Sequence, residues 1–244
     1  MKKTGIIVAL DDMDEMEGVA LAQQLSGKGL LFKGNDILDS DMGLGIIPLL
    51  NQHGGVMADP KLYDIPKTVA NRTKKFAKYG PVLLTVHASG GIPMMQAAVA
   101  NCGNTMILGV TVLTSFSSEE CILNFGNPPS AEVLKLARDA ALAGAHGIVC
   151  SPEELAFLRK FPELKNLIRV TPGIRPKWHL DPNDDQARIA TPAYAVRNGA
   201  DYIVIGRPIT MAKDPIEAAY KTIEEVKAAM AELEEEEEKT KGRR

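Results

Sequence analysis

The chain has 244 residues, of which 45% are hydrophobic, and its formal net charge at pH 7 is −3. This length and composition are typical of one α/β domain with a full core. The slightly acidic balance argues against the basic surface that nucleic-acid binding requires. No apolar stretch reaches the roughly 20 residues of a membrane-spanning helix, so we expect no membrane partner.

Three cysteines, Cys102, Cys121 and Cys150, are scattered along the chain. An odd, scattered set is typical of buried thiols in a reducing compartment, so we expect a cytoplasmic protein. Residues 1–4 lead straight into an apolar run, which argues against a signal peptide. The four histidines show no metal-ligand spacing, and the sequence therefore predicts no zinc site.

Short apolar runs alternate with longer segments of helical spacing along the whole chain. Most of the runs are continuous, as expected of strands that are buried on both faces of a parallel sheet. The eight runs are residues 5–10, 29–32, 55–57, 82–86, 106–113, 147–150, 167–170 and 202–205.

The segments between these runs carry apolar residues three and four positions apart, which is typical of amphipathic helices. Val133, Leu136 and Ala140 share one such face. Asp214 and Pro215 are typical of an N-cap and a first helical turn, and they begin the last amphipathic pattern.

Eight strand–helix units in about 240 residues predict an α/β fold, a single (β/α)8 TIM barrel over residues 1–231. A doubly wound open sheet is the structural alternative, but no Gly-x-Gly-x-x-Gly follows the first run. Residues 232–244 are predicted to form a charged helix end or tail. Glutamates occupy positions 234–238 in a row there, and such a run is typical of a solvated end.

Two carboxylates and one ammonium fall within six residues, at Asp59, Lys61 and Asp64, where the third apolar run ends. Strand alternation places Asp59 and Lys61 on the same face. An exposed salt bridge between them would stabilise the fold by only about 0–1 kcal/mol. The alternative is a catalytic array, which suits the C-terminal end of a barrel strand. Asp11 and Lys33 follow the first and second runs, at the same edge of the predicted barrel.

The loops after the seventh and eighth runs each combine a glycine with an arginine, Gly173 with Arg175 and Gly206 with Arg207. In many barrels these two loops bind a phosphate group. Glycine lets the backbone approach the anion, and a guanidinium offers a bidentate contact. Pairing of each arginine with a helix carboxylate is the alternative interpretation. Gln186, in the long segment before the next helix, is expected to cover the anion.

Motifs at the ends of these runs follow one another in a recognisable order. They are Val8-Ala9-Leu10-Asp11, Lys33, Asp59-x-Lys61-x-x-Asp64-Ile65-Pro66-x-Thr68, Val86-His87-Ala88-Ser89-Gly90-Gly91, Thr111-Val112-Leu113-Thr114-Ser115, Thr171-Pro172-Gly173-Ile174-Arg175, Asp185-Gln186 with Thr191-Pro192, and Gly206-Arg207-Pro208-Ile209-Thr210. Together they resemble the orotidine 5'-phosphate decarboxylases of the bacterial type. The Asp-x-Lys-x-x-Asp motif is shared across a wider superfamily, whereas the combination with the other motifs is specific.

The resemblance implies cofactor-free decarboxylation of orotidine 5'-monophosphate to uridine 5'-monophosphate, the last step of pyrimidine synthesis. It also implies a homodimer whose active sites lie at the interface.

Loss of CO2 leaves a carbanion at C6 that must be stabilised by fixed charges, and Lys61 is expected to protonate it. By motif position, the resemblance implies a charged array of Lys33, Asp59, Lys61 and Asp64, and contacts with the partner's site by Asp64, Ile65 and Thr68. It implies that the ribose is held by Asp11 and Lys33 and that the pyrimidine is met by Thr114 or Ser117. It implies that the phosphate is held by Arg175, Gln186, Gly206 and Arg207.

Two positions depart from the family's pattern. The family usually has one residue between the lysine of the second strand and a glycine, whereas Gly34 follows Lys33 directly here. The family also commonly has an apolar residue where Pro60 stands. Proline lacks an N–H and is typical of a strand end or edge, so we expect it to shift the neighbouring Asp59 and Lys61 side chains.

Three other functions remain open from the sequence. A sister enzyme of the same superfamily, such as a 3-keto-gulonate 6-phosphate decarboxylase or a hexulose phosphate synthase, shares Asp-x-Lys-x-x-Asp but uses magnesium. Those enzymes have a glutamate ligand where Lys33 stands, and an ammonium there repels a metal ion. A non-catalytic nucleotide-binding protein is supported only by the two departures. Another phosphate-binding barrel, such as an isomerase, explains the arginine loops but not Asp59, Lys61 and Asp64 together.

Overall fold

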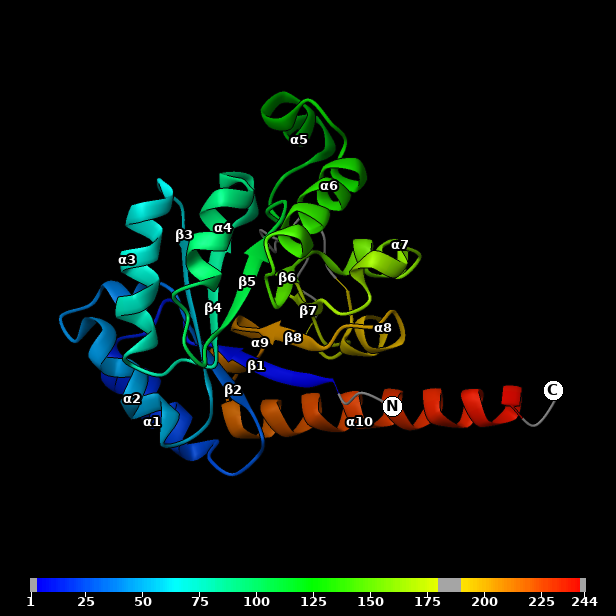
Figure 1. The fold of residues 1–244 in the computed structure, drawn as a ribbon. Helices are drawn as coiled ribbons and strands as arrows, with labels where there is room; N and C mark the ends of the chain where they lie inside the picture. Colours follow the sequence, from blue (N-terminus) through cyan, green and yellow to red (C-terminus); the bar gives the residue numbers. More distant parts are fainter. Residues whose placement is uncertain (1–3, 180–189, 242–244) are drawn as a thin grey trace.

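A computed structural model of the chain describes residues 4–179 and 190–241. Eight parallel strands close into a barrel in sequence order, β1 to β8, with helices around the outside (Figure 1). The predicted (β/α)8 barrel is therefore confirmed, and the open doubly wound sheet is excluded. The strands are β1 (Gly5–Ala9), β2 (Leu31–Gly34), β3 (Val56–Leu62), β4 (Leu83–His87), β5 (Met106–Val110), β6 (Gly147–Val149), β7 (Ile168–Thr171) and β8 (Tyr202–Ile205).

Each predicted apolar run overlaps one strand, because each run is buried on both of its faces. In β1, Ile7 and Ala9 pack inside the barrel with residues of other strands, whereas Ile6 and Val8 pack in the layer between the strands and the helices. The largest differences in length from the prediction are in β3 and β5. The fifth strand ends at Val110, and β3 continues through the charged motif to Leu62.

Helices follow the strands, and several begin at the residues that the sequence favours. Asp14 caps α1 by accepting a hydrogen bond from the N–H of Glu17 at 2.8 Å. Asp214 accepts from the N–H of Glu217 at 2.9 Å and confirms the predicted start of the last helix. The α-helices are α1 (Glu15–Gln24), α2 (Ile46–Asn51), α3 (Pro66–Ala77), α4 (Ile92–Val99), α5 (Ser118–Phe125), α6 (Pro129–Leu142), α7 (Leu155–Leu158), α8 (Pro192–Arg197), α9 (Arg207–Thr210) and α10 (Pro215–Lys241).

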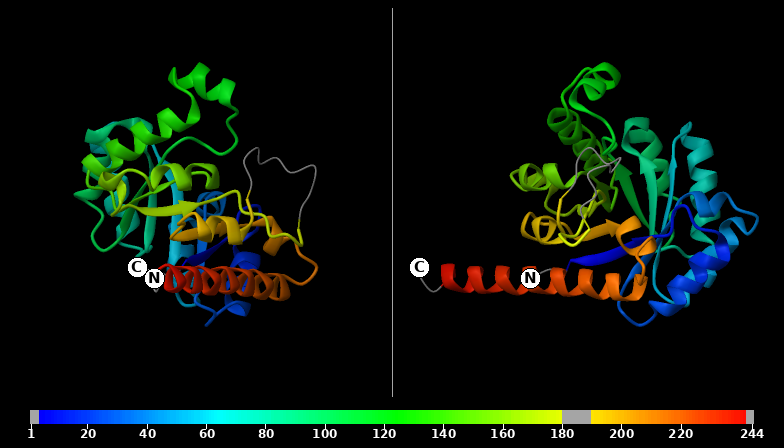
Figure 2. Two further views of the ribbon diagram at one scale, coloured as in Figure 1. Left: turned by 90° about the vertical axis from the view of Figure 1, so that its right-hand side faces the viewer. Right: turned by 180° about the vertical axis from the view of Figure 1, so that it is seen from behind.

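The last helix, α10, packs beside α8 and then extends beyond the barrel (Figures 1 and 2). An ion pair between Arg197 and Glu232 lies near the point where it leaves the body of the protein. The glutamate-rich segment continues as helix to Lys241. No helix in the described part of the chain is long and apolar enough to cross a membrane.

Close packing between neighbouring strands makes Gly147 a sensitive position in the barrel. A Cβ atom there would collide with the backbone oxygen of Ile168 and lie 2.8 Å from a methyl carbon of Leu108. Gly45 is the matched contrast, because it has helical dihedral angles and no atom lies within 4 Å of the place that a Cβ atom would occupy.

We therefore expect Gly147→Ala to lower the free energy of unfolding by about 1–3 kcal/mol, through overpacking that the backbone cannot relieve. Gly45→Ala should leave it within about 0.5 kcal/mol of the parent value. Urea unfolding followed by circular dichroism measures both. Equal stability of the two variants would contradict the packing described for β6.

Candidate active site

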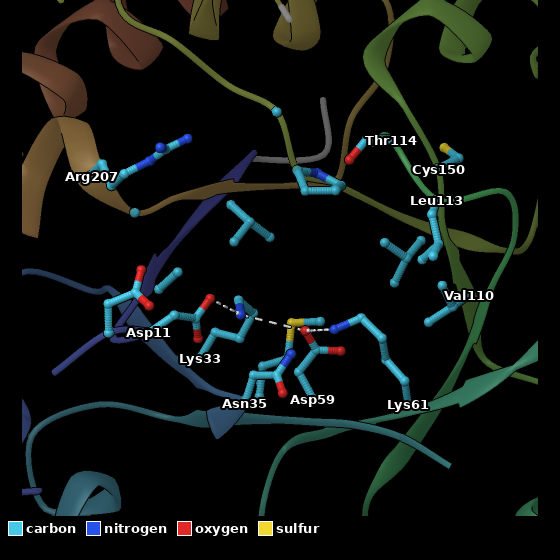
Figure 3. A pocket seen from close by; sticks show the side chains of 18 of the residues that line it. Asp11, Lys33, Asn35, Asp59, Lys61, Val110, Leu113, Thr114, Cys150 and Arg207 are labelled. Carbon is cyan, nitrogen blue, oxygen red and sulfur yellow. Dashed lines mark hydrogen bonds and ion pairs between the residues drawn. The ribbon is translucent and has the colours of Figure 1, made fainter. Parts of the chain in front are cut away.

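The C-terminal ends of the strands surround a cavity of about 360 Å³ (Figure 3). It collects residues that are far apart in the sequence and that come from both halves of the barrel. The predicted site residues that line it are Asp11, Lys33, Asp59, Lys61, Thr114, Arg175, Gly206 and Arg207.

Four side chains in this cavity form a line of alternating charge (Figure 3). The ammonium of Lys33 lies 2.5 Å from Asp11 Oδ2 and 3.4 Å from Asp59 Oδ2. The ammonium of Lys61 lies 2.8 Å from the same Asp59 oxygen. Every charge in the line therefore has an opposite charge beside it, as burial requires.

The middle of this line is the most deeply buried part. Lys33 is 7% exposed and Asp59 is 5% exposed, whereas the Lys61 side chain is 31% exposed towards the cavity. Burial lowers the pKa of Lys33, but the attraction of Asp59 and Asp11 outweighs it and raises the pKa above its ordinary value. Lys33 is consequently a permanent cation at neutral pH.

Asp11 lies at the other end of the line. Burial raises the pKa of its carboxyl group, against the opposing attraction of Lys33. Its Oδ1 atom is buried and has no hydrogen-bond partner within residues 4–179 and 190–241. A buried acceptor without a donor is unfavourable, so this oxygen is suited to a ligand hydroxyl.

The end of β3 is irregular where it carries Asp59 and Lys61. The pairing of β3 with β4 shifts register between Ala58 and Leu62, and Lys61 has a φ of 45°. The side chains of Asp59 and Lys61 do meet, but a bulge with a left-handed residue brings them together rather than regular alternation. Pro60 lies inside the bulge, and its presence is compatible with the ion pair.

A hydroxyl group that the sequence interpretation missed supports this bulge. Thr85, in β4, donates a hydrogen bond to Asp59 Oδ1 at 2.7 Å and accepts one from the N–H of Lys61 at 3.0 Å. The sequence does carry a signal for Thr85, because it is a single polar residue inside a buried apolar run. Asn35 also lines the cavity, directly after the Lys33-Gly34 pair that departs from the family's pattern.

The two arginines lie at the end of the cavity formed by the loops after β7 and β8. In the close-up, Arg207 lies on the side of Asp11, and Lys61 lies on the opposite side (Figure 3). Arg175 is 6% exposed, and its guanidinium donates to the carbonyl oxygen of Ile174 at 3.1 Å. Gly173 has a φ of 73°, a backbone conformation that glycine adopts without strain.

The remaining wall is apolar and is formed by Val110, Val112, Leu113 and Val149. Thr114 adds a hydroxyl to this wall. Ser117, the other residue expected at the pyrimidine, does not line this cavity. It caps α5 instead, where its hydroxyl accepts a hydrogen bond from the N–H of Glu120 at 3.2 Å.

Asp64, Ile65 and Thr68 do not line the cavity of their own chain. They lie on the connection from β3 into α3 and on its first turn. Asp64 is exposed and accepts a hydrogen bond from the N–H of Ile65 at 2.7 Å, and Ile65 is 65% exposed. Gln186 lies outside the described residues.

His87 ends β4 beside the charged line. Burial and the nearby ammonium of Lys61 lower its pKa, against the weaker influence of Asp59. Its ring packs edge-on against Tyr63, with centroids 5.6 Å apart. Burial and the ammonium of Lys61 both favour the neutral form of the His87 ring.

Metal ligation can be assessed from the donor set. Across the residues that the structure describes, no group of three or more His, Cys, Asp or Glu side chains could hold a metal ion. Asp11 and Asp59, the two carboxylates of the charged line, instead share the ammonium of Lys33.

A closed barrel with a charged line facing two arginines defines an enzyme-like site for an anionic ligand. Comparison with known families identifies it further. The model of the "Orotidine 5'-phosphate decarboxylase / HUMPS family" matches residues 4–222. The chain belongs to this family.

Individual relatives agree with this assignment. An orotidine 5'-phosphate decarboxylase of Halorhodospira halophila is 41% identical over 233 residues, which cover 92% of this chain and 96% of the relative. One of Anaeromyxobacter dehalogenans is 49% identical over 166 residues, covering 67% of this chain and 72% of the relative. The crystal structure of orotidine 5'-phosphate decarboxylase from Lactobacillus acidophilus matches with a TM-score of 0.77 and 33% identity, over 92% of this chain and 99% of that one.

The central position of Lys33 leads to a prediction about stability. Lys33→Met removes the cation between two carboxylates, and we expect a loss on the order of 3 kcal/mol in the free energy of unfolding at pH 7. The loss should shrink at pH 5. Without Lys33 the already raised pKa of Asp11 rises further, so the native state takes up a proton before the unfolded chain does and regains stability as the pH falls.

Urea unfolding at pH 7 and pH 5 measures this difference. Lys227→Met is the control, because Lys227 is exposed and forms a surface pair with Glu224 at 2.9 Å. It should change stability by less than about 1 kcal/mol at either pH. A loss for Lys33→Met that is independent of pH would contradict the coupling between Lys33 and Asp11.

Proposed function

We propose that this cavity is the site at which the chain converts orotidine 5'-monophosphate to uridine 5'-monophosphate and CO2, without a cofactor. The reaction is the last step of pyrimidine synthesis. One observation carries the proposal: a buried line of alternating charges and two arginines lie in the same cavity of a member of this family.

Lys61 is the proposed proton donor. When the bond from C6 to the carboxylate breaks, its electron pair stays on C6 in the plane of the ring, where no conjugation can spread the charge. A fixed ammonium stabilises this charge without reorganisation and then forms the C6–H bond. Lys61 suits this role because it is the cation of the line with the larger exposure to the cavity, 31% against 9% for the Lys33 side chain. The amine regains its proton from water.

Asp59 and Lys33 position this ammonium. Both ammonium groups contact the same oxygen, Asp59 Oδ2, so the carboxylate is held from two directions. The substrate carboxylate would lie near Asp59, and their repulsion would ease as CO2 leaves. We assign Asp59 the positioning of Lys61 as its main role.

The ribose and phosphate groups are proposed to lie towards the other end of the cavity. The unpartnered Oδ1 of Asp11 is suited to accept a hydrogen bond from a ribose hydroxyl. Arg175 and Arg207 supply two positive charges for the phosphate, with Gly173 and Gly206 leaving the backbone open to it. We include Gln186 in this group from its motif. Binding energy gained here fixes the reacting end of the substrate.

The apolar wall is proposed to hold the pyrimidine ring. Val110, Val112 and Leu113 offer a surface on which a planar ring packs, and Thr114 offers a polar atom at its edge. An apolar wall also strengthens the electrostatic effect of the charged line, because it excludes water from the reacting centre.

We also propose a homodimer in which each chain completes the site of the other. Asp64 and Ile65 are exposed beside the mouth of the barrel although they belong to the motif that carries Asp59 and Lys61. An exposed carboxylate and a 65% exposed isoleucine are suited to contact a second copy of the chain. Thr68, half-buried on the first turn of α3, would lie in the same contact.

A cytoplasmic location is proposed from the thiols. Cys102, Cys121 and Cys150 form no disulfide and are buried. Buried cysteines without disulfides are typical of proteins in a reducing compartment.

A magnesium-dependent sister reaction on a sugar phosphate is the competing function. It is disfavoured by charge, because the ammonium of Lys33 lies within 3.4 Å of both carboxylates that could serve as ligands. A divalent cation would have to displace it against strong repulsion.

The first test follows the ultraviolet absorbance of orotidine 5'-monophosphate in the presence of EDTA. We expect turnover by the parent chain, and a fall in kcat/KM of at least about 1,000-fold for Lys61→Ala, which removes both charge stabilisation and the proton donor. Lys78→Ala, an exposed lysine at the end of α3, is the control and should retain full activity. Turnover that EDTA abolishes would support the metal-dependent alternative, and nucleotide binding without turnover would support a non-catalytic protein.

A second test addresses the shared site. Lys61→Ala and Asp64→Ala should each be inactive, but mixing them should restore up to about a quarter of the parent activity. Random exchange makes half of the dimers mixed, and one of the two sites in each mixed dimer is intact.

The control is a mixture of Lys61→Ala with Asp59→Ala. These two residues belong to the same chain of each site, so no mixed dimer contains an intact site. Failure to recover activity in the first mixture, with subunit exchange confirmed by native mass spectrometry, would refute the sharing of Asp64.

A further inference from the structure

Thr85 is a polar residue at the centre of β4, where its neighbours Leu84 and Val86 are apolar and fully buried. Its own exposure is 0%. Burying a hydroxyl group is unfavourable unless the group forms hydrogen bonds. Thr85 uses its hydroxyl as both donor and acceptor, and both partners belong to the catalytic motif on β3.

The first partner is the carboxylate of Asp59. Its Oδ2 atom contacts the two ammonium groups, and its Oδ1 atom accepts the hydroxyl of Thr85 at 2.7 Å. The hydroxyl therefore fixes the rotation of the carboxylate about its last side-chain bond. Without this bond, Oδ2 can turn away and carry the ammonium of Lys61 with it.

The second partner is the backbone of Lys61. This residue has a φ of 45°, which is unfavourable for a side chain with a Cβ atom, and it lies where the regular pairing of β3 with β4 is interrupted. The N–H of Lys61 donates to the Thr85 hydroxyl at 3.0 Å in place of a backbone partner. Thr85 thus stabilises the left-handed backbone conformation of Lys61, which sets the direction of the Lys61 side chain.

Other buried threonines of the barrel act differently. Thr105 and Thr111 donate to the backbone oxygens of Pro81 at 2.8 Å and Val149 at 2.7 Å. These bonds join neighbouring strands and touch no charged group. Thr85 differs because it connects both members of one ion pair, Asp59 through its carboxylate and Lys61 through its backbone.

We propose that Thr85 is a positioning residue for the decarboxylation, acting through Asp59 and Lys61 to fix the ammonium that faces C6. The inference rests on the proposed function of the cavity. Thr85 does not line the cavity, so its effect falls on the chemical step rather than on substrate capture. Small displacements of a catalytic group have large effects on rate.

The test compares Thr85→Val, which keeps the branched shape and removes the hydroxyl, with Thr85→Ser, which keeps the hydroxyl. Thr105→Val is the matched control, because it removes a buried threonine hydroxyl bond outside the cavity. We expect Thr85→Val to lower kcat by about 10- to 100-fold, with KM within about 3-fold of the parent value. Thr85→Ser should stay within about 3-fold in kcat, and Thr105→Val should match the parent.

A binding measurement separates positioning from general damage. Uridine 5'-monophosphate with an oxyanion at C6 mimics the carbanion, and such an analogue reports how well the ammonium is placed. By calorimetry, Thr85→Val should weaken binding of this analogue by about the factor lost in kcat, and leave binding of uridine 5'-monophosphate within about 3-fold.

Two results would overturn the inference. One is parent-like kcat and analogue affinity in Thr85→Val. The other is an equal loss of affinity for both nucleotides, which indicates a merely structural role. A parent chain that neither turns over nor prefers the analogue would instead contradict the proposed function itself, and with it the role of Thr85.

Discussion

The carboxylate of Asp59, 5% exposed and held between two ammonium groups, is the constraint on which the rest of the site depends. A buried charge is tolerated only when its partners are close and correctly oriented. The barrel provides those partners through strand order. Ala9 of β1 is in register with Lys33 of β2, and Lys33 is in register with Met57 of β3. Asp11 lies two residues after Ala9, just beyond the end of β1, and Asp59 lies two residues after Met57 on β3, so the line of charges runs across three neighbouring strands.

Closure of the barrel determines where Arg207 lies relative to Asp11. Because β8 pairs with β1, the loop that carries Arg207 lies next to the strand that leads to Asp11 (Figure 3). The strands β5 and β6 are on the other side of the ring, and they contribute the apolar residues Val110 and Val149. In the proposed mode of binding, the phosphate, ribose and base of the nucleotide lie opposite different arcs of one closed sheet. An open sheet with the same residues would separate these groups.

The sequence predicted what depends on local pattern. Each strand is visible as an apolar run, and Asp59, Lys61 and Arg207 are visible because charged residues follow such runs. It could not predict what depends on contacts between strands. The left-handed conformation of Lys61 and its support by Thr85 require knowledge of where β4 lies against β3. The cap that Ser117 forms on α5 has a local signal in the sequence, the Glu three residues later.

The charges of the site also indicate how binding and reaction are divided. The charges of Asp11, Lys33, Asp59 and Lys61 sum to zero, so this end of the cavity attracts no anion by net charge. Arg175 and Arg207 add two positive charges at the other end, which match a phosphate of nearly −2. Under the proposed function, affinity comes from the phosphate, which does not react, and the neutral line is free to favour the charge that appears only at C6. The strain at Lys61, and the Asp11 oxygen that has no hydrogen-bond partner in the described part of the chain, are unfavourable for folding alone. They are explained by a site shaped for its ligand rather than for maximal stability.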